Sequence, residues 1–165
     1  MSPTTLPALA LLAALAGAPT PAAPAPAAQP TEPSVCTGTL SGAVTATFAC
    51  TVTARIEGNV ATVTIAVEGP VAGVRALQPG TVSLAVPVPS GTYAGEALKS
   101  AASSVETASG VAYAAGAGRG EVTLTVDQAE RYKQAPNHLV MSGSLKARLV
   151  PAKPGQGEVV VEVHF

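Results

Sequence analysis

The chain has 165 residues, of which only 12% are charged, and its formal net charge of -1 excludes a partner bound mainly through bulk charge, such as nucleic acid. Three Tyr, two Phe and no Trp leave few of the large aromatic side chains that dominate binding hot spots. The length suits one domain with a single core once an export segment is removed.

Residues 1–27 are predicted to form a signal peptide. The apolar stretch LPALALLAALAGA, Leu6–Ala18, has the length of a signal-peptide core and is too short to cross a bilayer as a helix. Cleavage after Ala16 and cleavage after Ala27 both satisfy the small-x-small rule, and the sequence leaves this choice open. No Lys or Arg precedes the stretch, so the amino terminus alone supplies the usual positive charge. The mature chain is expected in the periplasm or outside the cell.

A Pro/Ala tract, Pro19–Pro33, follows the apolar stretch. Pro removes backbone donors and favours extended conformations, so residues 28–35, which remain after the later cleavage, are predicted to be a semi-rigid linker. The alternative, a proline-rich ligand for a groove-type recognition domain, requires a partner that an exported chain is not expected to meet.

Cys36 and Cys50 are the two cysteines of the chain and are expected to form a disulfide. A lone pair in an exported domain is typical of a structural bridge. A hairpin that turns near Gly42 to Val44 would place both sulfurs on one face. The alternatives, a redox pair and a metal site, lack the C-x-x-C spacing and further nearby ligands.

Period-2 alternation predicts most of the remaining structure. In FACTVTARIE and NVATVTIAVE, residues 48–57 and 59–68, apolar and polar side chains alternate, and Gly58-Asn59 favours a tight antiparallel hairpin between them. The same alternation recurs in TVSLAVPVP (81–89), EVTLTVD (121–127), HLVMSGSLKARLVP (138–151) and EVVVEVHF (158–165).

The middle of the chain has weaker patterns. Pro87 and Pro89 cannot donate to a ladder, so they confine the end of their strand to a sheet edge or exit. Ala94–Ser103 is rich in Ser and Ala without a clear helix cap, and it is predicted to be irregular or a single helical turn. A loose hairpin is predicted around Ser109-Gly110.

About eight or nine short strands without intervening helices predict an all-β fold, an antiparallel sandwich or jelly-roll of Greek-key type that spans residues 36–165. The segments CTGTLSGAVTATFAC, PSGTY, GEVTLTV and SGSLKARLVP with GEVVVEVHF resemble small exported β-sandwich domains of uncharacterised function from GC-rich bacteria. Those domains share a Gly-x-Leu strand, a Leu-Val-Pro stop and a closing strand that ends in Phe. The resemblance implies a fold and no activity.

A catalytic or metal-binding set is not expected. Asp127 is the single Asp of the chain, and His138 and His164 are its two His. Ser142 and Ser144 lack the strand-to-helix context of a nucleophile elbow. We therefore predict no enzyme, no cofactor and no metal site.

Partner contacts are predicted in two strand-connecting segments, PSGTYAGEALKS and AERYKQAPNH. They contain Tyr93, Tyr132, Lys133 and Asn137, polar and aromatic types that recognition surfaces favour. The alternative for each Tyr is packing over an end of the sandwich. The expected partner is a protein or carbohydrate of the cell envelope.

The strand that ends at Phe165 has two interpretations. Val159, Val161, Val163 and Phe165 form one row that the sandwich core would cover. The other interpretation is the C-terminal insertion signal of a small outer-membrane β-barrel, for which the chain lacks two aromatic girdles, so membrane insertion is not expected. The function expected is that of a non-enzymatic structural or surface-binding module, with a secreted hydrolase or a protease inhibitor as further alternatives.

Overall fold

The computed structural model describes residues 34–165, and the predicted signal peptide and residues 28–33 of the predicted linker lie outside this range. Between residues 34 and 165 the protein consists of antiparallel strands and one short 3-10 turn, η1 (Gly95–Ala97), without any α-helix. The strands are β1 (Ser34–Gly42), β2 (Ala46–Glu57), β3 (Val60–Glu68), β4 (Val74–Ala85), β5 (Gly91–Ala94), β6 (Ser100–Thr107), β7 (Ala112–Gly116), β8 (Glu121–Arg131), β9 (His138–Pro151) and β10 (Val159–His164). The all-β class predicted from the alternation is confirmed.

Eight of the strands close into a ring, in the order β1, β2, β3, β4, β6, β7, β9, β10 and back to β1. The ring strands follow one another in chain order, which is a simpler connectivity than the Greek-key pattern expected. β8 pairs along the free side of β9, and β5 pairs with β8 at the outer edge. The two strands therefore extend one side of the ring.

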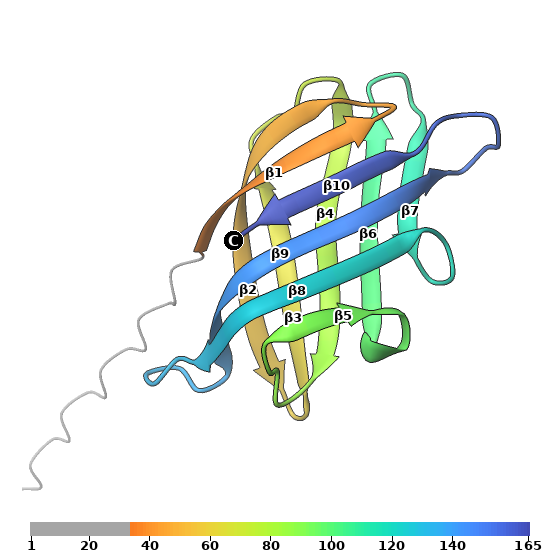
Figure 1. Ribbon diagram of the computed structural model, residues 1–165. Coiled ribbons are helices and arrows are strands. Elements are labelled where there is room, and N and C mark those ends of the chain that lie inside the picture. The colour runs from red at the N-terminus through yellow and green to blue at the C-terminus, as the bar shows by residue number, and fades with distance from the viewer. Residues whose placement is uncertain (1–33) are drawn as a thin grey trace, which may run out of the picture.

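The ring is flattened into two layers that cross steeply (Figure 1). One layer contains β1, β10, β9, β8 and β5, and the other contains β2, β3, β4, β6 and β7. β2 joins the layers because its first half pairs with β1, whereas Ala54 and Arg55 pair with Leu139 and His138 of β9. At the opposite corner β7 pairs with the last two residues of β9.

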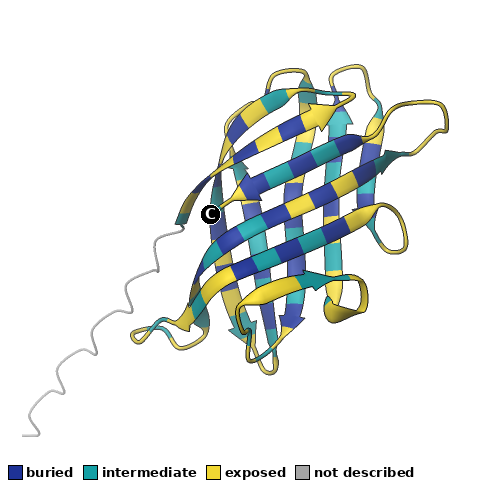
Figure 2. Ribbon diagram, in the orientation of Figure 1, coloured by how far each residue is buried: buried dark blue, intermediate teal, exposed yellow. Residues whose placement is uncertain are grey.

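Alternation along each strand places apolar side chains between the layers, as the banding of Figure 2 shows. The largest fully buried side chains come from both layers, and examples are Leu40, Ile65, Leu84, Leu124 and Leu145. Leu145 of β9 lies against the backbone at Gly80 of β4, where a Cβ atom would meet its side chain. The two layers are thus in direct contact at the centre of the molecule.

Several boundaries differ from the expectations. β1 begins at Ser34, so the last two residues of the predicted linker pair with β2. β4 begins at Val74 and passes through a register shift between Gln78 and Thr81. The helical turn expected within Ala94–Ser103 is η1, but residues from Ser100 onward belong to β6.

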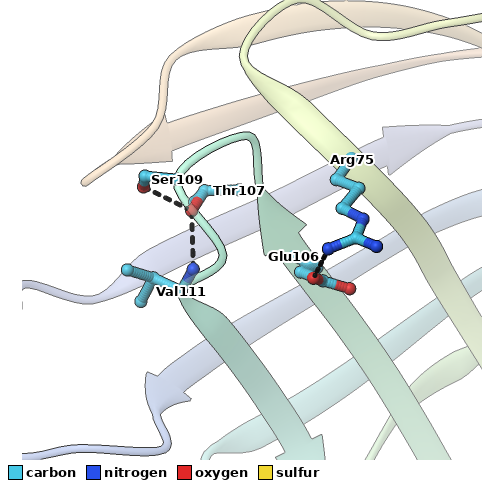
Figure 3. Close-up of polar contacts among 5 residues, drawn as sticks. All are labelled: Arg75, Glu106, Thr107, Ser109 and Val111. Carbon is cyan, nitrogen blue, oxygen red and sulfur yellow. Dashed lines mark hydrogen bonds and ion pairs between the residues drawn. The ribbon is translucent and has the colours of Figure 1, made fainter.

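The turn between β6 and β7 confirms the predicted hairpin around Ser109-Gly110, and a buried hydroxyl holds it closed (Figure 3). Thr107 Oγ1 accepts the N–H of Val111 at 3.0 Å and shares a hydrogen bond of 2.9 Å with Ser109 Oγ. Next to this turn, Arg75 of β4 pairs with Glu106 of β6 at 3.1 Å on the exposed surface. The Thr107 contacts thus hold the turn from its buried side, and the ion pair joins β4 and β6 on the outer side.

The disulfide Cys36–Cys50 is present and joins directly opposite residues of β1 and β2. Both cysteines are buried, and the hairpin turns within residues 43–45, as the spacing predicted. Two residues along, the ring of Phe48 lies over Gly38, where a Cβ atom would overlap the ring. The bridge and the aromatic ring together cover one end of this hairpin.

The last strand forms part of the core. Val159, Val161 and Val163 are fully buried, and the half-buried Phe165 packs against the same cluster. The backbone of Phe165 continues the ladder, since its N–H donates to Gly143 O at 3.0 Å and its carbonyl accepts the Gly143 N–H at 2.7 Å. The expected core-facing row is therefore what the structure contains.

The substitution of both cysteines, Cys36→Ala and Cys50→Ala, should lower the free energy of unfolding by about 3 kcal/mol, because the bridge closes a loop of about fifteen residues in the unfolded chain. Denaturant unfolding of the oxidised protein and of the double variant measures this loss. Reductant in the unfolding buffer should bring the wild type to the same midpoint and leave the variant unchanged. An unfolding curve of the wild type that ignores reductant would contradict a stabilising bridge.

Removal of Val163–Phe165 should lower the free energy of unfolding by about 3–5 kcal/mol. The truncation removes the fully buried Val163 side chain from the core and breaks two backbone hydrogen bonds to Gly143. Thermal and denaturant unfolding measure the loss. His164→Ala is the matched control, since this side chain is 67% exposed and should leave the melting temperature unchanged. If the shortened chain melts like the intact one, the insertion-signal interpretation of this strand has to be reopened.

Candidate functional site

A hollow of about 540 Å³, open to solvent on one side, lies between residues 95–101 and 116–122. Its volume falls in the range of small-molecule sites. Its walls are the segment from η1 to the start of β6 and the connection from β7 to β8. The lining residues are Gly95, Leu98, Lys99, Ser100, Ala101, Gly116, Ala117, Gly118, Arg119, Gly120, Glu121 and Val122.

The β7–β8 connection is a tight two-residue turn. Gly116 and Arg119 exchange two backbone hydrogen bonds of 2.7 and 3.1 Å, and the central residues Ala117 and Gly118 have φ values of 51° and 82°. Positive φ at both central positions defines a type I′ turn, in which Gly at the second position relieves strain. The N–H groups of the two central residues take no part in these two hydrogen bonds.

Close backbone contacts fix this turn against its neighbours. A Cβ atom at Gly116 would overlap the carbonyl of Ala101 in β6, and one at Gly120 would overlap the carbonyl of Arg148 in β9. Both glycines also have positive φ. The turn is therefore held between the two layers by contacts that a larger residue would not permit.

The facing wall is held by backbone hydrogen bonds. Leu98 N–H closes η1 by donating to Gly95 O at 3.1 Å, and its half-buried side chain packs against the core. Lys99 N–H donates to Ser83 O at 2.8 Å, which attaches the wall to β4. The Lys99 side chain starts from a fixed backbone although its charged end is exposed.

Three charged residues line the hollow: Lys99, Arg119 and Glu121. The Arg119 guanidinium donates to the carbonyl of Pro151 at 3.0 Å, which holds it beside the end of β9. Glu121 lies directly opposite Arg148 across the β8–β9 ladder. These pairings give Arg119 a fixed position and place a second cation next to the acidic residue.

Arg148 forms a two-pronged ion pair with Glu158, with N–O distances of 2.6 and 2.9 Å. Hydrogen bonding to Glu158 raises the pKa of Arg148 above its ordinary value, and the charges of Glu158 and Glu121 act in the same direction. Arg148 stays protonated in any case, so the pair is a fixed surface contact. Glu121 thus faces a permanent positive charge.

The four predicted contact residues occupy two separate places. Tyr93 lies in β5, opposite Leu124, and its hydroxyl donates to the carbonyl of Pro89. Tyr132, Lys133 and Asn137 lie in the β8–β9 loop. Tyr132 follows Leu124 by eight residues along β8, which separates the two Tyr positions by roughly 25 Å.

Contacts within the β8–β9 loop show how it is held. The backbone of Tyr132 pairs with His138, and Asn137 O accepts the Ile56 N–H at 2.7 Å. The Tyr132 hydroxyl donates to Gln134 Oε1 at 3.0 Å, while Lys133 is exposed. The fixed backbone presents these side chains without a surrounding hollow.

The other predicted segment, PSGTYAGEALKS, in contrast contributes Gly95, Leu98, Lys99 and Ser100 to the hollow, although its Tyr93 does not line it. Tyr93 was singled out in this segment by its residue type, whereas the residues that line the hollow are its neighbours in the same segment. The facing turn was not predicted, and the alternating glycines of GAGRG, Gly116–Gly120, were the available signal for it.

The groups that were considered for chemistry lie apart. Asp127 is exposed at a register shift of β8, and His138 is held by its backbone at the start of β9. His164 Nε2 lies 3.5 Å from Glu162 on the open outer face, opposite Ser144. Among residues 34–165, no three His, Cys, Asp or Glu side chains gather in a way that would hold a metal ion.

Residues 34–165 also contain no helix that is long and apolar enough to cross a membrane. Comparison of the chain with protein-family models, with curated proteins and with solved structures found no match.

Replacing Tyr132 and Lys133 together with Ala should leave the melting transition nearly unchanged, because Lys133 is exposed and the Tyr132 hydroxyl bonds to Gln134 of the same loop. If this loop contacts a partner, the variant should lose that partner in a pull-down from host extract. Gln134→Ala, in the same loop, is the control for the hydroxyl contact. Loss of folding in the double variant would contradict a recognition role for these residues.

Proposed function

We propose that the protein is an exported, non-enzymatic binding module of the cell envelope or extracellular space, and that its ligand occupies the hollow between residues 95–101 and 116–122. The single observation that carries this proposal is the hollow itself: two anchored wall segments border a volume of about 540 Å³ that is open to solvent on one side. A ligand there would meet a preorganised surface, which lowers the entropic cost of binding.

The scaffold supports this role. The scaffold is rigid because most of its strands have no free edge, a disulfide is buried in it and its apolar core is continuous. Such a scaffold is suited to holding loops in place rather than to moving them. A protein with only structural duties would not require the hollow. The binding role is therefore favoured over the purely structural one.

The side-chain distribution weighs against the lipid-inserted alternative. Outward positions of the strands carry residues such as Thr37, Thr39, Thr53, Arg55 and Lys146, which are exposed, while the apolar side chains face the interior. A wall in contact with lipid requires the reverse arrangement.

The buried hydroxyls serve the fold. Ser103 Oγ donates to the carbonyl of Pro79 at 2.7 Å, and Thr107 closes the β6–β7 turn. A hydroxyl that is committed to a carbonyl in this way stabilises its neighbours and is not poised as a nucleophile. The non-enzymatic role agrees with these contacts.

The proposal is tested by fractionating the native host and capturing partners with the tagged chain from its envelope fraction and culture supernatant. Ser100→Trp fills the hollow from an exposed position and should remove the captured partner. Thr39→Trp places the same ring on the outer face of β1 and should retain it. Both variants should keep the fold, as circular dichroism checks.

Equal capture by the two Trp variants would show that the partner does not bind in the hollow. A chain that fractionates as an integral membrane protein would overturn the proposal as a whole. A captured protease whose activity is blocked would instead support the inhibitor alternative.

A further inference from the structure

We propose that the hollow recognises a singly charged oxyanion group, either the carboxylate of a uronic acid or the phosphodiester of an envelope polymer. This inference deepens the proposed binding function and rests on it. Both chemistries present one negative charge per unit, and both accept hydrogen bonds from guanidinium, ammonium and backbone N–H donors.

The first argument is the charge of the lining. Lys99 and Arg119 contribute two positive charges and Glu121 one negative charge, which leaves a local balance of one positive charge. Glu121 is opposite Arg148 across the ladder, and because Arg148 is itself paired with Glu158, this neighbouring pair leaves the balance of the lining unchanged. In a chain whose net charge is -1, this end of the molecule is thus a place where an anion is attracted.

The second argument is preorganisation. The hydrogen bond from Arg119 to Pro151 O holds the guanidinium in place and uses one of its five N–H donors. The backbone of Lys99 is fixed to β4, and the turn at Ala117-Gly118 leaves two N–H groups outside its own hydrogen-bonded pair. Fixed donors on one side of a hollow are the arrangement that backbone anion sites share.

The third argument is what the lining residues do not provide. They include no aromatic side chain on which a neutral sugar ring would stack, and apart from Val122 they are exposed or half-buried. A largely exposed hollow gives an apolar ligand little area to bury. Charge and backbone donors are the groups that remain for recognition.

The test is a titration of the ¹⁵N-labelled, disulfide-bonded chain followed by the amide shifts of residues 95–101 and 116–122. The probes are trigalacturonate, glycerophosphoglycerol and neutral galactotriose. One or both anions should produce saturable shifts at these amides, and the neutral trimer should not. The anion that binds identifies the source, a uronate or a phosphodiester.

Lys99→Gln together with Arg119→Gln should weaken binding of that anion by about tenfold or more. Lys146→Gln together with Arg131→Gln is the matched control, since it changes the net charge equally at exposed positions outside the hollow and should leave the affinity within about twofold. Binding by the wild type should also weaken as salt is raised to about 0.5 M.

Absence of saturable shifts with both anions, or equal losses in the two double variants, would overturn the inference. Binding of galactotriose with the same affinity as trigalacturonate would also overturn it. These outcomes are separate from failure of the proposed function. Partner capture that is lost in Ser100→Trp but retained in the Lys99 and Arg119 double variant leaves the binding module intact and rejects the anion.

Discussion

The whole fold depends on β9, which pairs with four other strands. Its 14 residues run alongside β8 on one side and β10 on the other, and its two ends meet β2 and β7. Without the contact to β7 the ring would open at that corner, and the two layers would remain joined only through β2. Closure joins residues far apart in the sequence, such as Ala54 with Leu139, and the chain entropy lost in doing so must be offset by burial. Leu145, Ala147 and Leu149 on the inner face of β9 are fully buried and supply part of it.

Strand positions were predictable from the sequence because nearly every strand has one face on the core and one on solvent. The alternation in residues 138–151 matches β9 to the residue, and the pairing of Cys36 with Cys50 followed from their being the two cysteines of an expected exported domain. The first half of β4 was not predicted, because the predicted strand began only at Thr81. Pro79 and Gly80 break the alternation at a register shift, which in a sequence resembles the end of a strand.

The structure explains why a strand tolerates Pro79 there. The register shift removes the need for its missing N–H in the ladder, and the Ser103 hydroxyl donates to its carbonyl at 2.7 Å. Gly80, next along, leaves the space that the Leu145 side chain fills from the other layer. None of these partners is near Pro79 in the sequence, so a single chain pattern does not reveal the arrangement.

The candidate site was harder to predict for the same reason. Its walls come from segments about twenty residues apart in the sequence. They face each other because β7 pairs with β9 at only two residues and then turns into β8. β8 must leave in this way, since Val122, Leu124 and Val126 complete the same core cluster as Val105 of β6. A longer β7–β9 pairing would close the ring further but would displace β8 from that cluster. The position of the hollow thus follows from the short β7–β9 pairing, which leaves the rest of that edge of β9 to β8.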